Sequence, residues 1–317
     1  MRKIIIDTDV GSDDAVALIM ALKEPDVEVL AVTTVAGNVP VDLATRNALA
    51  TIEVVGRQAP PVYQGAAKPL FRDLVTAVKV HGDDGMGDLG LCNPTTAIHP
   101  GHPADVIPAL AAQYPGQVEL VTLGPLTNVA LAILKDPENM KKLKHVWSMG
   151  TSGFGPGNTT PVSEFNIYVD AESFGVLLDS GIPLTIVGYD LCVGDAVLDE
   201  LDIRTLKTCG KPEAAFAVDC NDGVYRYNID SRGKPEIDLP DPVCMAAALW
   251  PEVVKEFVPC ICRVCTREAL TYGQVVVDEG LSLAVDHGFR PELVNARVCR
   301  GLDAARFKEK LMASLMG

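Results

Sequence analysis

The first 34 residues of the chain carry the pattern of a strand, a helix and a second strand, and this pattern constrains the fold more than any other feature. Residues 3–9 (KIIIDTD) form an apolar run that predicts a buried strand, and residues 15–22 place apolar side chains at helical spacing. Residues 27–34 predict another strand. Strand, helix and strand within about 30 residues predict a βαβ unit, which requires a parallel sheet.

The same alternation recurs further along the chain. It continues with strand patterns at 118–124, 145–150 and 183–190 and helix patterns at 125–135 and 171–181. Residues 213–227 predict a helical region, and residues 230–242 predict an exposed stretch after it. Past residue 258, short strands around 275–280 and 292–299 predict a small antiparallel edge, and residues 303–316 predict a closing helix. We therefore expect a single α/β domain over residues 1–317, with a mostly parallel open sheet flanked by helices.

Charge and hydropathy exclude several classes of partner. The 317 residues include 27 Lys and Arg against 42 Asp and Glu, a net charge of −15. Nucleic acids and anionic membranes bind clustered positive charge, so this balance argues against both. No apolar run approaches the roughly 20 residues of a membrane-spanning helix. The apolar run near the N-terminus is too short for a signal peptide, which leads us to expect a cytoplasmic protein.

The nine cysteines are an odd number and are spread through the chain, which favours reduced thiols over a disulfide framework. Cys260, Cys262 and Cys265 have the spacing C-x-C-x-x-C, so a zinc site has to be considered. They lie in a strand-like stretch whose side chains point to alternate faces, and no histidine lies near them in the sequence. Buried structural cysteines are therefore the preferred interpretation.

Four carboxylates fall within eight residues where the first strand ends and the first helix begins: Asp7, Asp9, Asp13 and Asp14. Their mutual repulsion is costly unless a cation lies among them, and helix capping accounts for only one. Oxygen ligands at the carboxyl end of a strand indicate calcium or magnesium. An EF-hand is excluded, because its glycine position falls on Ser12 and its final glutamate position on Leu18.

Other polar residues follow later strands. Asn38 follows the second strand and is either a turn residue or part of the same site. Asp241 is either the N-cap of a helix, with Pro242 at its first position, or a further carboxylate of the site. The glycine-rich stretch 150–161 is a candidate loop or flap over the site.

Together these segments resemble the nucleoside hydrolase family, the inosine-uridine preferring N-ribohydrolases. The matching segments are DTDVGSDDAVA at 7–17, TTVAGNV at 33–39, HGDDGMG at 81–87, TLGPLTNVAL at 122–131, GN-TP-x-x-EFNIYVDAE across 157–172, and the Asp of LPDP at 241. The resemblance implies the nucleoside hydrolase fold, one Ca²⁺ ion, and hydrolysis of a ribonucleoside to ribose and free base. It also implies a homodimer or homotetramer.

The resemblance further assigns roles by position. Asp9, Asp14 and Asp241 match the calcium carboxylates, and Leu123 matches the residue whose backbone carbonyl binds the ion. Asp13 matches the general base that takes a proton from the attacking water. The residues that match the ribose-binding set are Asn38, Asn158, Glu164 and Asn166, and Phe165 lies in the same segment. Met149 matches a residue that lines the sugar, and His81 matches one near the base. The candidate catalytic residues are Asp13, Asn38 and His81.

One position departs from the family pattern. Many members carry His before the downstream calcium Asp, as the acid that protonates the departing base, and here that residue is Pro240. The candidates to replace this acid are His81, Asp222, Tyr225 and Tyr227, and the two tyrosines are also substrate-binding candidates. Alternatively, stacking on the base lets it leave as an anion without an acid. The alternative is a protein that binds calcium and ribose with weak or no turnover. A phosphatase of the haloacid dehalogenase type is less favoured, because it leaves Asp13, Asp14 and Asn38 unexplained.

Overall fold

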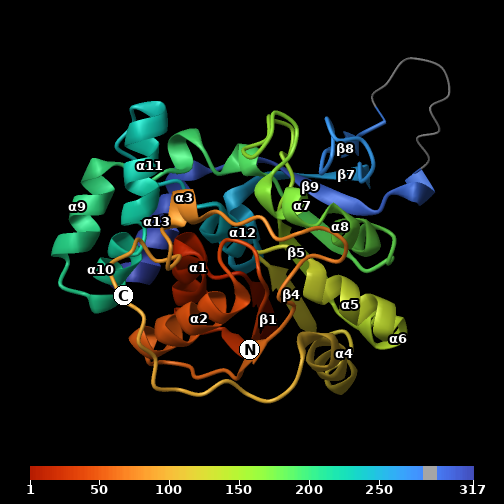
Figure 1. Ribbon diagram of the computed structural model, residues 1–317, viewed down its shortest axis with the longest axis horizontal. Helices are drawn as coiled ribbons and strands as arrows, with labels where there is room; N and C mark the ends of the chain where they lie inside the picture. The colour runs from red at the N-terminus through yellow and green to blue at the C-terminus, as the bar shows by residue number, and fades with distance from the viewer. Residues whose placement is uncertain (281–290) are drawn as a thin grey trace.

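A nine-stranded sheet forms the centre of the computed structural model, which describes residues 1–280 and 291–317 (Figure 1). The strands are β1 (Arg2–Thr8), β2 (Val27–Thr34), β3 (Val62–Gln64), β4 (Val118–Thr122), β5 (His145–Met149), β6 (Leu184–Val187), β7 (Val254–Val264), β8 (Val275–Asp278) and β9 (Ala296–Leu302). Their order across the sheet is β3-β2-β1-β4-β5-β6-β9-β7-β8.

Neighbouring strands from β3 to β9 pair in parallel, whereas β7 runs antiparallel to both β9 and β8. The predicted α/β fold, with a mostly parallel sheet and a small antiparallel edge, is therefore confirmed. Parallel strands place their carboxyl ends at one edge of the sheet, which is where ligands bind in open α/β folds.

The helices cover both faces of the sheet (Figure 1). They are α1 (Ser12–Lys23), α2 (Val41–Val55), α3 (Val78–His81), α4 (Pro103–Gln113), α5 (Thr127–Lys135), α6 (Pro137–Met140), α7 (Phe165–Val169), α8 (Ala171–Leu178), α9 (Glu200–Thr208), α10 (Pro212–Asp219), α11 (Asp222–Arg232), α12 (Pro240–Leu249) and α13 (Ala304–Met316), with 3₁₀ turns at Tyr189–Leu191, Gly194–Ala196, Pro251–Val253 and Pro291–Leu293. None in the described ranges is long and apolar enough to cross a membrane.

Two hydrophobic clusters lie on opposite faces of the sheet. Ile4 and Ile6 of β1 belong to the cluster that contains α1, α12 and α13, while Ile5 belongs to the cluster with α5 and α8. This follows from the alternation of side chains along a strand. Every residue of α1 is buried, so the helix that carries Asp13 and Asp14 is held on all sides.

Three local details differ from the sequence predictions. The helical region expected near 213–227 is two helices, α10 and α11. The stretch after α11, expected to be exposed, is buried from Ile237 onward. Helix α12 begins at Pro240 and not at Pro242, and its N-cap is Leu239. Proline suits the first helical position because that position needs no N–H donor. Asp241 therefore lies within the first turn and is not the N-cap.

The prediction of buried cysteines is confirmed for Cys260 and Cys262 but not for Cys265. All nine are free thiols, and Cys260 and Cys262 are buried on one face of β7. Cys265 lies just past the end of β7 and is half-buried against Thr271. In the described part of the chain, no cluster of potential metal ligands includes these thiols.

Candidate active site

A single cavity at the carboxyl end of the parallel strands gathers most of the predicted site residues. It is lined by Asp13, Asn38, His81, Leu123, Met149, Asn158, Glu164, Phe165, Asn166, Tyr227 and Asp241. Asp13 and Asp241 come from the first turns of α1 and α12, and Leu123 and Met149 from the ends of β4 and β5. The other side chains come from the loop after β2, from α3, from the segment between β5 and α7, from α7 and from α11. The chain segments that the sequence analysis grouped therefore meet in space.

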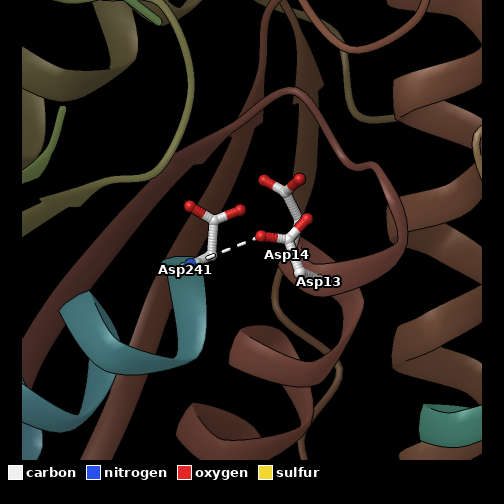
Figure 2. A group of neighbouring side chains, drawn as sticks. All are labelled: Asp13, Asp14 and Asp241. Atoms are coloured by element: carbon white, nitrogen blue, oxygen red, sulfur yellow. Dashed lines mark hydrogen bonds between the residues drawn. The ribbon is translucent and has the colours of Figure 1, made fainter. Parts of the chain in front are cut away.

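Three buried carboxylates meet at the floor of this cavity: Asp13, Asp14 and Asp241. One oxygen of each lies within 4.8 Å of the others (Figure 2). Asp13 and Asp14 extend from the N-terminus of α1, and Asp241 comes from the first turn of α12 (Figure 2). The backbone N–H of Asp241 donates to Oδ2 of Asp13 over 3.4 Å, which joins the two helix ends.

Asp14 and Asp9 are tied to the surrounding backbone. Asp14 accepts hydrogen bonds from the Thr8 hydroxyl, from the Gly11 N–H (2.8 Å) and from Nδ2 of Asn38 (3.1 Å). Asp9 accepts from the Asn38 N–H over 2.6 Å. Asp9 lies beside the three-carboxylate group, outside the set within 4.8 Å of one another.

The backbone around Asp9 requires glycine. A Cβ atom on Gly37 would lie 2.0 Å from Oδ2 of Asp9, and one on Gly124 would lie 2.6 Å from Oδ1. Both glycines follow strands that flank β1, so the chain closes over Asp9 from two sides. The TTVAGNV and TLGPLT motifs therefore have a steric reason for their glycines.

Among the described residues, no lysine or arginine forms an ion pair with Asp9, Asp13, Asp14 or Asp241, and His81 lies 3.8 Å from Asp13. Burial, followed by neighbouring carboxylates, raises the pKa of Asp9 and Asp241 well above the ordinary value. Burial raises the pKa of Asp13 and of Asp14 to about 6. Oδ1 of Asp9 and Oδ1 of Asp13 are buried without a hydrogen-bond partner in the described structure. These orphaned oxygens and the all-oxygen donor set fit a divalent cation such as Ca²⁺.

Asp7 lies next to the site and is held by hydrogen bonds from neighbouring elements. One of its oxygens accepts from the Thr33 hydroxyl and from Nδ2 of Asn128 (2.9 Å), and Asn128 also donates to the Thr34 carbonyl. Burial raises the pKa of Asp7 to about 7. Asp7 therefore links the ends of β1 and β2 to the start of α5.

Glu164 and Asn166 form the opposite wall. Glu164 caps α7 by accepting from the N–H groups of Asn166 (3.0 Å) and Ile167 (3.3 Å), and its burial raises its pKa to about 7. Nδ2 of Asn166 donates to the Leu123 carbonyl over 2.7 Å and lies 3.4 Å from Sδ of Met149. The EFN motif thus orients Asn166 toward the strand ends.

His81 lies next to the carboxylates. Its Nδ1 is 2.8 Å from the Ser12 hydroxyl and 3.8 Å from Oδ1 of Asp13. Burial lowers the pKa of His81, although Asp14 and Asp238 act in the opposite direction. The ring is therefore mainly neutral near pH 7.

The two candidate tyrosines of α11 have different surroundings. Tyr227 lines the cavity, whereas Tyr225 packs partly buried against the hydrophobic core. Val224, Tyr227 and Asn228 share the cavity face at helical spacing, and Tyr225 is turned away from it. Asp222 pairs with the exposed Arg226 and does not line the cavity.

The polar cavity residues Tyr189, Asn228, Arg232 and Asp238 were among those missed from the sequence. The i,i+4 spacing from Val224 to Asn228 and from Asn228 to Arg232 was a usable signal for the two residues of α11. Asp238 was hidden in a stretch that reads as exposed. Ser12 was missed as the partner of His81.

Comparison with known proteins defines the class of this site. The model of the family "inosine-uridine preferring nucleoside hydrolase" matches residues 4–309, so the chain belongs to this family and is a nucleoside N-ribohydrolase. This finding excludes the phosphatase alternative.

Individual relatives agree with the family match. The chain is 36% identical over 315 residues to a pyrimidine-specific ribonucleoside hydrolase, RihA, of Shewanella baltica. The aligned region covers 99% of this chain and 96% of the relative. An uncharacterised protein, C1683.06c, of Schizosaccharomyces pombe is 45% identical over 60% of this chain and 61% of its own length. The solved structure of a plant nucleoside hydrolase, PpNRh1, superposes with a TM-score of 0.92 and 29% identity over 100% of this chain and 99% of that one.

Proposed function

We propose that this protein hydrolyses the N-glycosidic bond of ribonucleosides with a Ca²⁺ ion held by Asp9, Asp14, Asp241 and the backbone carbonyl of Leu123. The observation that carries this proposal is the buried group of carboxylates, with orphaned oxygens, at the floor of the cavity. When bound, the ion supplies a Lewis acid that holds ribose hydroxyls and lowers the pKa of a water molecule.

Asp13 is the general base in this proposal. Its Oδ2 is held by the Asp241 N–H, while its Oδ1 has no hydrogen-bond partner in the described structure. A pKa raised to about 6 suits a base that works near neutral pH. Asp13 takes a proton from water as the water oxygen attacks the anomeric carbon. Because the water attacks directly, no covalent sugar intermediate forms and the configuration inverts.

The remaining wall residues bind the ribose. Asn38, Asn158, Glu164 and Asn166 offer amide and carboxyl groups to its hydroxyls, and Met149 and Phe165 line the apolar face of the sugar. The transition state carries positive charge on the ribose, and the acidic floor stabilises that charge. His81 and Tyr227 line the same cavity and contact the base in this proposal.

A reducing-sugar assay over a panel of ribonucleosides, with and without chelator, tests this function. We expect ribose release that chelation removes and added Ca²⁺ restores. Asp13→Asn should lower kcat by at least about 10²-fold, the usual contribution of a general base, while ribose still binds. The matched control is Asp195→Asn, since Asp195 is exposed in the 3₁₀ turn Gly194–Ala196 and does not line the cavity.

Two outcomes would contradict the proposal. Calorimetric binding of nucleoside without ribose release at high enzyme concentration would favour the binding-only alternative raised by Pro240. Turnover that is unaffected in Asp13→Asn would remove Asp13 as the base. Assembly as a homodimer or homotetramer and a cytoplasmic location stay predictions; light scattering of the purified protein tests the first.

A further inference from the structure

Pro240 stands where an acid is expected, so another group must stabilise the departing base. A hydrogen-bond network of four side chains lines the same cavity and offers such a group. Tyr189 lies in the 3₁₀ turn after β6, Asn228 and Arg232 lie on α11, and Asp238 precedes α12. All four residues line the cavity together with Pro240. The function proposed above uses none of them.

Asp238 is the anchor of this network. Its Oδ1 accepts from Nδ2 of Asn228 over 2.6 Å, and its Oδ2 accepts from the Tyr189 hydroxyl over 3.0 Å. Asp238 is only 9% exposed and Asn228 only 1% exposed. Both carboxylate oxygens are engaged, so Asp238 fixes its neighbours and is not a group free to bind substrate.

Arg232 completes the network. Its Nη2 donates to the Tyr189 hydroxyl over 2.9 Å, and its Nη1 lies 3.5 Å from Oδ2 of Asp238. A guanidinium carries five N–H donors in a fixed plane. Within the described structure these two contacts are the only ones that Arg232 makes as a side-chain donor. Its side chain is 36% exposed and lines the cavity, so its remaining N–H groups are not taken up by the protein.

The chemistry of the leaving group defines what such a donor can do. When the C1′–N bond breaks, its electron pair stays on the base nitrogen, while C1′ takes the water oxygen and Asp13 takes the proton. The base then carries negative charge, which is delocalised onto a carbonyl oxygen adjacent to that nitrogen where one exists. A guanidinium stays protonated at neutral pH, so it stabilises this charge without donating a proton, and the base takes its proton from solvent.

We propose that Arg232, positioned by Tyr189 and Asp238, stabilises the departing base as an anion in place of the acid absent at Pro240. This inference rests on the proposed hydrolase function. It assigns a substrate class: nucleosides of 2-oxopyrimidines, uridine and cytidine, whose carbonyl lies next to the leaving nitrogen. Adenosine, whose base has no carbonyl, is a poor substrate in this scheme.

The test compares two substrates that differ in how much help the leaving group needs. Uridine requires stabilisation of its base, whereas 4-nitrophenyl riboside releases a phenolate that is already stable. In Arg232→Gln we expect kcat/KM on uridine to fall about 10²–10³-fold, the effect of removing one oxyanion-stabilising donor, and the nitrophenyl riboside rate to fall less than about tenfold. The preference for uridine over adenosine should fall with it.

The positioning residues have a graded effect. Tyr189→Phe and Asp238→Asn keep Arg232 and lose its anchor, so we expect a loss of about tenfold on uridine and a smaller loss on the nitrophenyl riboside. Arg226→Gln is the matched control on the same helix, because Arg226 is exposed, pairs with Asp222 and does not line the cavity. Melting temperatures of all variants show that they are folded.

The outcomes separate this inference from the function on which it rests. If the wild-type protein releases ribose from no nucleoside, the proposed function fails. If the wild-type protein is active but Arg232→Gln slows both substrates equally, or leaves uridine turnover unchanged, the role of Arg232 is refuted and the hydrolase function stands.

Discussion

Asp241 and Asp13 are 228 positions apart in the sequence, yet the backbone N–H of one donates to the side chain of the other over 3.4 Å. The contact is possible because α1 and α12 pack together in one hydrophobic cluster with their N-termini close to each other (Figure 2). Helix N-termini carry partial positive charge, which stabilises the acids gathered there. The remaining repulsion among those acids is what a cation would relieve.

Calcium should therefore stabilise the folded protein. We expect the melting temperature to rise with added Ca²⁺ and fall with chelator; at a concentration 100 times Kd the gain is about 2.7 kcal/mol. Asp241→Asn should remove most of this response, because it deletes one ligand carboxylate, while Asp195→Asn on the surface should keep it. Differential scanning fluorimetry measures both. A calcium response that persists in Asp241→Asn would place the ion elsewhere.

The close approach of Gly37 to Asp9 gives a steric prediction. In Gly37→Ala the added Cβ would meet the Asp9 carboxylate, so either Asp9 or the loop must move. We expect a loss of about 1–3 kcal/mol in unfolding free energy, as for overpacking, together with weaker calcium binding. Gly175→Ala is the control, since Gly175 lies in α8 with only ordinary contact at 3.4 Å, and alanine there should stabilise by about 0.5–1 kcal/mol. Chemical denaturation and calcium titration test the pair.

The sequence predicted the fold and the acidic residues from Asp7 to Asp14 because both depend on local patterns, whereas only the family resemblance grouped Asp241 with them. The βαβ periodicity and the carboxylates at the end of β1 are contiguous in the chain, so they are visible without the structure. The base side of the cavity is different: Asp238, Tyr189 and Arg232 come from three elements whose relative placement depends on tertiary packing. Their network has no local signature, and Asp238 lies in a stretch rich in charged and turn residues that resembles an exposed loop.

The two tyrosines of α11 offer a matched comparison. Tyr227 is 38% exposed and lines the cavity. If its ring stacks on the base, Tyr227→Ala should weaken nucleoside binding by about 1–3 kcal/mol, which raises KM, with little change in stability. Tyr225 packs against the core, so Tyr225→Ala should lower the melting temperature and leave KM of the folded enzyme unchanged. Steady-state kinetics and thermal melts of both variants decide this. Equal effects on KM would mean that the helix face is assigned incorrectly.

Glu164 predicts how stability depends on pH. Its burial raises its pKa from 4.5 in the ordinary state to about 7 in the folded protein, so folding favours the protonated form. The stability that this proton contributes is fully present below about pH 4.5 and is lost as the pH rises through about 7, a change of about 3 kcal/mol at most. Glu164→Gln cannot ionise and should lose this part of the slope, while Glu138→Gln, whose side chain is 85% exposed, should keep it. Urea unfolding of chelated protein between pH 5 and pH 8 measures the slopes, and identical slopes in wild type and Glu164→Gln would show that Glu164 is already ionised at pH 5.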